Sequence, residues 1–265
     1  MIDVAVSGAT GRMGRTLGRL LGDAPDLRAI GGIAPDRPME GSEAIGYPEI
    51  VDVGDAGPLL ARAHAVIDFS APDQVARLLD RYAGALAGRA LLVGTTGLTD
   101  DLERALDAQA EGTAVLVASN FSLGMNLLLG LVEQAARALP ADGYDIEVVE
   151  THHRLKEDAP SGTALSLAEA AARGRGQTLE ASRRDGRSGR IGPRPTGEIG
   201  LHAVRGGGVA GEHQVRLLGE REQIALSHSA ASRELFAEGA MVAARWLMDK
   251  PAGRYGMAQV LGFQP

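Results

Sequence analysis

The chain has 265 residues, 45% hydrophobic and 23% charged, which is ordinary for a globular protein and excludes disordered and fibrous classes. This length fits one large domain or two medium ones. Acidic residues outnumber basic ones by 34 to 27, which argues against a nucleic-acid partner. The 36 glycines show no three-residue repeat, so a collagen-like chain is excluded as well.

Cysteine usage and the absence of targeting signals bear on location. The chain has no cysteine, which excludes disulfide and thiolate chemistry and fits a reducing compartment. The first residues lead directly into an apolar run without a basic leader, and no apolar run reaches the roughly 18 residues of a membrane span. We therefore expect a soluble, cytoplasmic protein with no membrane partner.

The first 120 residues alternate short apolar runs with helical patterns. The runs are apolar throughout rather than alternating, which indicates strands buried on both faces, as in the parallel sheet of a βαβ array. We predict an α/β, Rossmann-like, doubly wound domain here. Its expected strands are 2–7, 28–34, 66–70, 91–95 and 115–119, and its expected helices are 12–21, 73–86 and 99–111.

The pattern changes near Gly124, which predicts a second domain of α+β type. Three strand-like runs follow one another there with Gly-rich turns and no helix between them, which favours an antiparallel or mixed sheet. A last amphipathic helix, at 234–248, can return to the first domain. The other elements expected after residue 124 are helices at 125–139 and from Ser161, and strands at 145–151, 200–205, 212–218 and 223–228.

Residues 173–194 hold seven arginines against Glu180 and Asp185, a basic stretch in an acidic chain. Such a stretch is typical of a solvated loop. A positive rim that attracts an anionic substrate or cofactor is the alternative.

A glycine-rich turn follows the first predicted strand and opens the first helix. Its spacing is G-x-x-G-x-x-G, and glycine permits a tight turn, close approach of backbone N–H groups to a pyrophosphate, and close packing of helix on strand. We predict a dinucleotide-binding turn made of Gly8, Ala9, Thr10, Gly11, Arg12, Met13 and Gly14.

The residue that reads the adenosine ribose is expected just after the second strand. Asp36 there can accept a hydrogen bond from a 2′-hydroxyl, which favours NADH. The adjacent Arg37 can instead bind a 2′-phosphate, which favours NADPH. The cofactor is therefore NADPH, NADH or both.

Two consecutive histidines, His152 and His153, open the most informative segment of the chain. Neighbouring side chains on a strand point to opposite faces, so the two rings are expected to serve different tasks. Metal binding is an alternative, but neither a cysteine nor an H-E-x-x-H spacing supports it, and we expect no metal.

The residues after the histidines fit an anion site. Ser161 is placed to cap a helix whose first turn contains Gly162 and Thr163, and a helix start offers N–H groups to an anion. The same residues also fit a simple cap. Lys156 is one of only two lysines in a chain that otherwise uses arginine, which suggests a role as proton donor that a guanidinium cannot take, chance being the alternative.

These motifs resemble the dihydrodipicolinate reductase family of lysine and diaminopimelate biosynthesis. The resemblance runs along almost the whole chain, and its most specific part is the paired histidines followed by Lys156 and Asp-Ala-Pro-Ser-Gly-Thr-Ala. The other matching stretches are 6–14, 68–70, 94–97, 119–126, 211–213 and 228–233.

The resemblance implies a division of the chain and of its tasks. A dinucleotide-binding domain would comprise residues 1–123 and 233–265, and a substrate-binding and oligomerisation domain residues 124–232, assembled as a homotetramer. His152 and Lys156 would be the catalytic proton donors, and His153, Gly162 and Thr163 would contact substrate beside Ser161. The loops that hold the nicotinamide would be Gly94, Thr95 and Thr96, and Ala118, Ser119, Asn120 and Phe121.

The resemblance implies an NAD(P)H-dependent 4-hydroxy-tetrahydrodipicolinate reductase, which transfers a hydride to a small cyclic imine dicarboxylate and yields tetrahydrodipicolinate. An imidazole suits the proton transfer near neutral pH. The family's acidic and basic pair after the second strand falls near Pro35 and Asp36 here, a departure that leaves Asp36 and Arg37 as candidates. The alternatives are a reductase of another imine and a non-catalytic nucleotide sensor.

Overall fold

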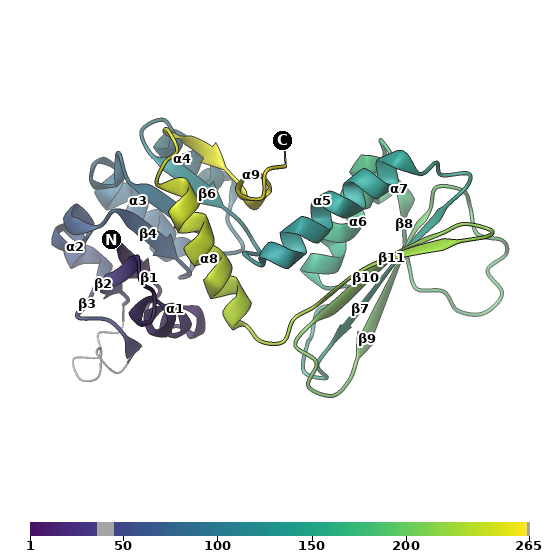
Figure 1. The fold of residues 1–265 in the computed structure, drawn as a ribbon, viewed down its shortest axis with the longest axis horizontal. Helices are drawn as coiled ribbons and strands as arrows, with labels where there is room; N and C mark the ends of the chain where they lie inside the picture. The colour runs from purple at the N-terminus through teal and green to yellow at the C-terminus, as the bar shows by residue number, and fades with distance from the viewer. Residues whose placement is uncertain (36–44, 264–265) are drawn as a thin grey trace. The chain divides into compact units, whose positions relative to one another are not determined.

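The computed structural model describes residues 1–35 and 45–263 (Figure 1). The chain divides into two compact units. The first comprises Met1–Leu123 and Glu234–Pro265, and the second is Gly124–Arg233. The first unit is thus built from both ends of the chain, and the second from the middle.

The first unit contains a parallel sheet. Its strand order is β12-β6-β5-β4-β1-β2-β3, so the chain adds strands on one side of β1 and then on the other. Every pair of neighbours is parallel, which confirms the predicted Rossmann-like, doubly wound fold. The strands are β1 (Ile2–Ser7), β2 (Leu27–Ile33), β3 (Ile50–Val51), β4 (Ala65–Asp68), β5 (Ala90–Val93), β6 (Ala114–Val117) and β12 (Gly253–Tyr255).

Helices cover both faces of this sheet, and each expected helix is present within one or two residues. Thr99 caps α4 by accepting a hydrogen bond from the Leu102 N–H, and Pro72 occupies the first turn of α3, where no N–H is needed. The helical elements are α1 (Arg12–Gly22), η2 (Val53–Asp55), α2 (Gly57–Arg62), α3 (Pro72–Leu86), α4 (Asp100–Ala110), α8 (Glu234–Leu247) and α9 (Met257–Val260).

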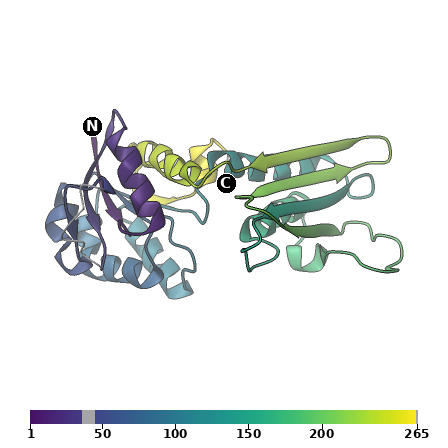
Figure 2. The ribbon, with the colours of Figure 1, turned by 90° about the horizontal axis from the view of Figure 1, so that it is seen from below.

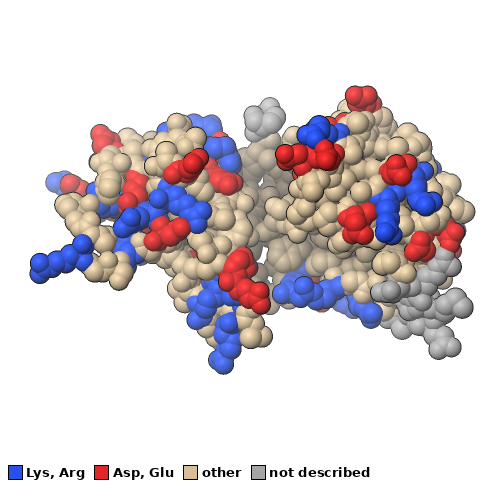
Figure 3. Space-filling view, turned by 180° about the vertical axis from the view of Figure 1, so that it is seen from behind, with Lys and Arg blue, Asp and Glu red and all other residues tan. Residues whose placement is uncertain are grey.

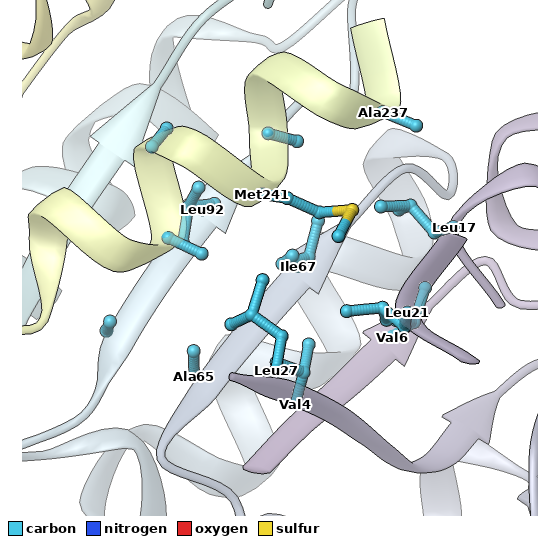
Figure 4. Packing of buried hydrophobic residues seen from close by; sticks show 14 of the residues in the cluster. Val4, Val6, Leu17, Leu21, Leu27, Ala65, Ile67, Leu92, Ala237 and Met241 are labelled. Atoms are coloured by element: carbon cyan, nitrogen blue, oxygen red, sulfur yellow. The ribbon is translucent and has the colours of Figure 1, made fainter. Parts of the chain in front are cut away.

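The C-terminal helix α8 is part of the core of the first unit, as its amphipathic pattern predicted. Figure 4 shows Met241 of α8 beside Ile67 of the sheet, and Ala237 of α8 belongs to the same buried cluster. A Cβ at Gly239 would lie 1.8 Å from the carbonyl oxygen of Phe121, so only glycine permits this approach of α8.

The second unit contains a mixed sheet with strand order β11-β10-β7-β9-β8 (Figure 2). The β10 strand pairs antiparallel with both β7 and β11, whereas β9 pairs parallel with β7 and β8, so the predicted mixed sheet is confirmed. The elements are α5 (Leu123–Ala138), β7 (Asp145–His152), α6 (Gly162–Gly174), α7 (Leu179–Ser182), β8 (Arg183–Asp185), β9 (Ile199–Arg205), β10 (Glu212–Leu218) and β11 (Gln223–Ser229).

One face of the mixed sheet is apolar and packs on α5 and α6. Ile146, Val148, Val215 and Leu217 are buried there with Leu167 of α6. Alternate residues of β7 are buried, the period expected of a strand with two different faces. Glu150 and His152 continue the buried set of β7, which draws two polar side chains into the protein interior.

The arginines of residues 173–194 are largely paired with carboxylates or carbonyls. Arg187 binds Glu147 and Glu198, and Arg194 binds Asp145 and Glu147. These contacts favour a structural role for the segment over an anion-attracting rim. Figure 3 likewise shows basic and acidic side chains interspersed on the face that it displays.

Short elements are the part of the fold that the sequence did not predict. The β3, β8 and β12 strands and the α2, α7 and α9 helices span two to six residues each, too few for a hydrophobic period to be read. Within the described residues, no helix has both the length and the apolar character needed to cross a membrane.

Candidate active site

The glycine-rich turn joins β1 to α1 at the carboxyl edge of the parallel sheet. Gly8 has φ +80°, and a Cβ there would lie 2.4 Å from the carbonyl oxygen of Phe69. A Cβ at Gly14 would lie 2.2 Å from the carbonyl oxygen of Gly8. The turn is therefore closed by backbone-to-backbone contacts that only glycine allows.

The start of α1 has the character of an anion site. Gly11 is its N-cap and provides no side-chain cap hydrogen bond. The first-turn N–H groups of α1 belong to Arg12, Met13 and Gly14, and together with the helix dipole they favour a phosphate. The residues of the turn thus fit a dinucleotide pyrophosphate.

The other predicted cofactor loops meet the same sheet edge. Gly94, Thr95 and Thr96 follow β5, and residues 118–121 follow β6, the next strand in the sheet. The carboxyl ends of parallel strands are where nucleotides bind in such folds. Asp36 and Arg37 lie outside the described residues.

A buried carboxylate, missed in the sequence, holds this edge together. Asp68, at the end of β4, is fully buried and accepts hydrogen bonds from the hydroxyls of Ser70 (2.7 Å) and Thr95. Burial raises the pKa of Asp68 above its ordinary value, against the effect of the hydroxyl donors. Asp68 thereby links the end of β4 to the loop after β5.

The paired histidines lie at the end of β7 in the second unit. His152 is buried, and its Nδ1 lies 2.6 Å from Oε2 of Glu150. The backbone N–H of His153 donates to the carbonyl of Val209, and the enclosed Nδ1 of its ring has no hydrogen-bond partner among the described residues. The two rings therefore have different surroundings, as the strand geometry predicted.

Helix α6 begins beside these rings. Ser161 is its N-cap and accepts from the Ala164 N–H at 3.1 Å, which confirms the predicted cap. Gly162 has open space beside it, since a Cβ there would meet no atom within 4 Å. The helix start thus presents accessible backbone N–H groups, to which Thr163 adds a hydroxyl.

Lys156 follows in the loop after β7 and pairs with Asp158, its Nζ lying 2.7 Å and 2.9 Å from the two carboxylate oxygens. This hydrogen bond holds the pKa of Asp158 below its ordinary value. The Lys156 N–H donates to the carbonyl of His153 at 3.1 Å, so the lysine is tied to the histidine pair.

His213 on β10 belongs to this cluster, although the sequence analysis did not include it among the candidate site residues. Its Nε2 lies 3.1 Å from the Ser161 hydroxyl, and its ring contacts that of His152 edge-on at 5.1 Å between centroids. Burial, and then the neighbouring His152, lower the pKa of His213 to about 4, so its ring is neutral at neutral pH. Within the described residues, no group of three or more His, Asp or Glu side chains is arranged to hold a metal ion.

Each unit, taken by itself, therefore has its own set of candidate functional groups. The first unit offers a glycine-rich turn and two loops at the carboxyl edge of a parallel sheet. The second offers an imidazole on a buried carboxylate, an ion-paired lysine and the open start of a helix. Together these features are those of a dinucleotide-dependent oxidoreductase.

Comparisons with known proteins agree. Residues 2–121 match the model for the N-terminus of dihydrodipicolinate reductase, and residues 124–261 match that for its C-terminus. The 4-hydroxy-tetrahydrodipicolinate reductase of Caulobacter vibrioides is 46% identical, with 99% of this chain and 98% of that protein covered. That of Myxococcus xanthus is 44% identical, with 100% and 99% covered.

The fold is shared with a solved dihydrodipicolinate reductase from Paenisporosarcina sp. TG-14 with dipicolinate bound. The TM-score is 0.78 at 24% identity, with 98% of each chain covered. The chain belongs to the dihydrodipicolinate reductase family. It is an NAD(P)H-dependent oxidoreductase.

Proposed function

We propose that the chain reduces 4-hydroxy-tetrahydrodipicolinate, the cyclic imine dicarboxylate for which its relatives are named, in lysine and diaminopimelate biosynthesis. The observation that carries the proposal is the grouping within one unit of His152, held by a buried carboxylate, and the open start of α6. A dicarboxylate that must be protonated requires both an acid and an anion site.

The first unit binds the cofactor in this proposal. The turn at residues 8–14 holds the pyrophosphate, and the loops at 94–96 and 118–121 hold the nicotinamide half. NADH or NADPH bound there supplies the hydride. The residues proposed to choose between the two are Asp36 and Arg37, which would read the ribose 2′-hydroxyl or a 2′-phosphate.

The second unit binds the substrate. One carboxylate accepts hydrogen bonds from the start of α6, where Ser161, Gly162 and Thr163 provide N–H and hydroxyl donors. His153 and Lys156 contribute to holding it or the second carboxylate. The open space beside Gly162 supports this placement, because it lets a ligand oxygen approach the backbone.

His152 moves the proton. The 4-hydroxyl leaves as water, which gives a conjugated cyclic imine. Hydride addition to the ring carbon that bore the hydroxyl moves electrons through the conjugated bonds to nitrogen and leaves an enamine, which takes up a proton to give tetrahydrodipicolinate. His152 donates that proton, and Lys156 is the second donor. The difference between lysine and arginine matters here because an ammonium can give up its proton and a guanidinium effectively cannot.

The assembly and location complete the proposal. The protein acts in the cytoplasm as a homotetramer, without a nucleic-acid or membrane partner. Residues 124–232 bind substrate and form the subunit contacts, and residues 1–123 with 233–265 bind the dinucleotide. The mixed sheet supports this division, because Val204 and Ile224 are apolar and exposed on it.

A coupled assay tests the function. Pyruvate and aspartate semialdehyde are condensed by the preceding synthase, the protein is added, and oxidation of NADH and of NADPH is followed separately. Oxidation that depends on the synthase product supports the proposal, and the two rates give the cofactor preference. Cofactor binding without oxidation would refute the substrate assignment and favour another imine or a nucleotide sensor.

A further inference from the structure

We propose that Glu150 is a positioning residue, which fixes the ring of His152 so that Nε2 delivers the proton and which ties that ring to the start of α6. The inference rests on the proton-donor role proposed for His152. It names the ring nitrogen that donates the proton and the carboxylate that holds the ring.

The two oxygens of Glu150 have different partners. Oε2 lies 2.6 Å from His152 Nδ1, and Oε1 accepts from the Ser161 backbone N–H at 3.0 Å. A single carboxylate therefore contacts both the proposed acid and the N-cap of the proposed anion site. Glu150 and His152 are two residues apart on β7, so their side chains point to the same face of the strand. Their contact therefore follows from the two-residue period of a strand.

Arg205 of β9 keeps this carboxylate in place. It donates to both oxygens of Glu150, from Nη1 at 2.7 Å and from Nη2 at 2.8 Å, and its Nη2 also donates to the carbonyl of Asp158 at 2.6 Å. The strand register explains the contact, since Arg205 pairs with His152 across β7 and β9. A forked pair of this kind fixes the plane of the carboxylate as well as its place.

The carboxylate is ionised although it is buried. The Glu150 side chain is 1% exposed, which alone would raise its pKa, but the hydrogen bonds from Arg205, His152 and the Ser161 N–H hold the pKa below its ordinary value. An ionised carboxylate only accepts, so the nitrogen facing it must carry the hydrogen. The neutral ring of His152 is therefore the Nδ1–H form, and its acidic form adds the second proton at Nε2.

The other polar groups near His152 do not compete for Nδ1. The ring of His213 on β10 meets that of His152 edge-on and binds the Ser161 hydroxyl instead. Lys156, in the loop after β7, is paired with Asp158. Nε2 lies on the side of Gly211, where a Cβ would come within 3.1 Å of it, so glycine keeps space beside the nitrogen.

Glu147 provides a matched control on the same strand. Like Glu150, it is a carboxylate bound by arginine and histidine, although it has two arginines where Glu150 has one: Arg187 and Arg194 donate to it, and His202 Nε2 lies at 2.7 Å. It lies three residues from Glu150 and so on the opposite face of β7. Glu147→Gln therefore disturbs a network of the same residue types away from the proposed site.

The first test needs no variant. Nitrogen NMR of the ¹⁵N-histidine-labelled protein, at a pH where the ring is neutral, reports which nitrogen of His152 bears hydrogen. The signals are assigned by their loss in His152→Asn. We expect a protonated Nδ1, and a protonated Nε2 would overturn the inference whether or not His152 is catalytic.

The second test compares Glu150→Gln with Glu147→Gln in the coupled assay. We expect Glu150→Gln to lower kcat about 10- to 100-fold, because the ring is no longer held where Nε2 delivers the proton. The KM for the cofactor should not change, and kcat and KM of Glu147→Gln should match the wild type. An unchanged kcat in Glu150→Gln would overturn the inference.

The outcomes separate the two proposals. If the ring carries its hydrogen on Nδ1 but His152→Ala leaves kcat unchanged, the proton-donor role of His152 is refuted. The contribution of Glu150 to the reaction is then refuted as well. An Nε2–H ring together with an inactive His152→Ala refutes the role of Glu150 alone. If Glu150→Gln does not fold, the NMR test of the wild-type protein still decides the inference.

Discussion

The substitution Gly14→Ala tests whether the tight closure of the glycine-rich turn is needed for stability and for cofactor binding. A Cβ at this position would lie 2.2 Å from the carbonyl oxygen of Gly8 and 2.6 Å from the Cα of Ala9. Such contacts essentially never fall below 3.0 Å, so the turn must open by at least 0.8 Å. The atoms it meets are backbone, so no side-chain rotation can relieve the clash.

Two opposing effects set the magnitude. Alanine in place of glycine in a helix interior is favourable by about 1 kcal/mol, whereas overpacking a close-packed region costs about 1–3 kcal/mol. We expect a net loss of up to about 2 kcal/mol in the free energy of unfolding. Displacement of the N–H groups proposed to bind the phosphate should raise the Kd for NADH or NADPH at least about tenfold, or about 1.4 kcal/mol.

Gly22→Ala, in the last turn of the same helix, is the control. A Cβ there meets no atom within 4 Å, so this change should leave the cofactor Kd unaltered and stabilise the fold by up to about 1 kcal/mol. Denaturant unfolding and calorimetric cofactor titration measure both quantities. If Gly14→Ala binds the cofactor with wild-type affinity, the tight closure of this turn is not needed for cofactor binding.

Three further predictions concern the second unit. His152→Ala should lower kcat by about 10²–10⁴-fold with the cofactor Kd nearly unchanged, and an unaltered kcat would remove the residue from the mechanism. Lys156→Arg should not preserve activity in the coupled assay, since it keeps the charge but cannot give up a proton; full activity would show that charge suffices. The pKa of His213 is about 4 when folded against 6.5 in a model peptide, so the unfolded chain binds the proton first and stability should fall as the pH drops from about 6.5 to about 4. The loss is at most roughly 3 kcal/mol; denaturant unfolding of His213→Gln over this range should show a shallower fall, and an identical fall would contradict the assignment.

The parts of the site that the sequence predicted are those formed by neighbours in the chain. The glycine-rich turn depends on a seven-residue spacing, and the Ser161 cap on the residues directly around it. The long strands and helices were predicted because each spans enough residues to show a period. Local pattern thus sufficed for these features.

The parts that were missed depend on contacts between distant strands. Arg205 reaches Glu150 because β9 pairs with β7 in one register, and His213 lies opposite Glu150 because β10 does so on the other side. A single sequence does not give strand register. The spacing Glu150-x-His152 was an available signal, because residues two apart share a face of a strand, but it could not show that Arg205 keeps the carboxylate ionised.

The return of α8 and β12 to the first unit has a consequence for how the protein is made. Residues 1–123 leave the ribosome before the helix that covers their sheet and before the strand that pairs with β6. Arg245 of α8, which binds Asp26 through two 2.7 Å hydrogen bonds, is synthesised more than two hundred residues after its partner. The middle unit is complete in sequence earlier, so during translation it can finish folding while the first unit still lacks its last helix.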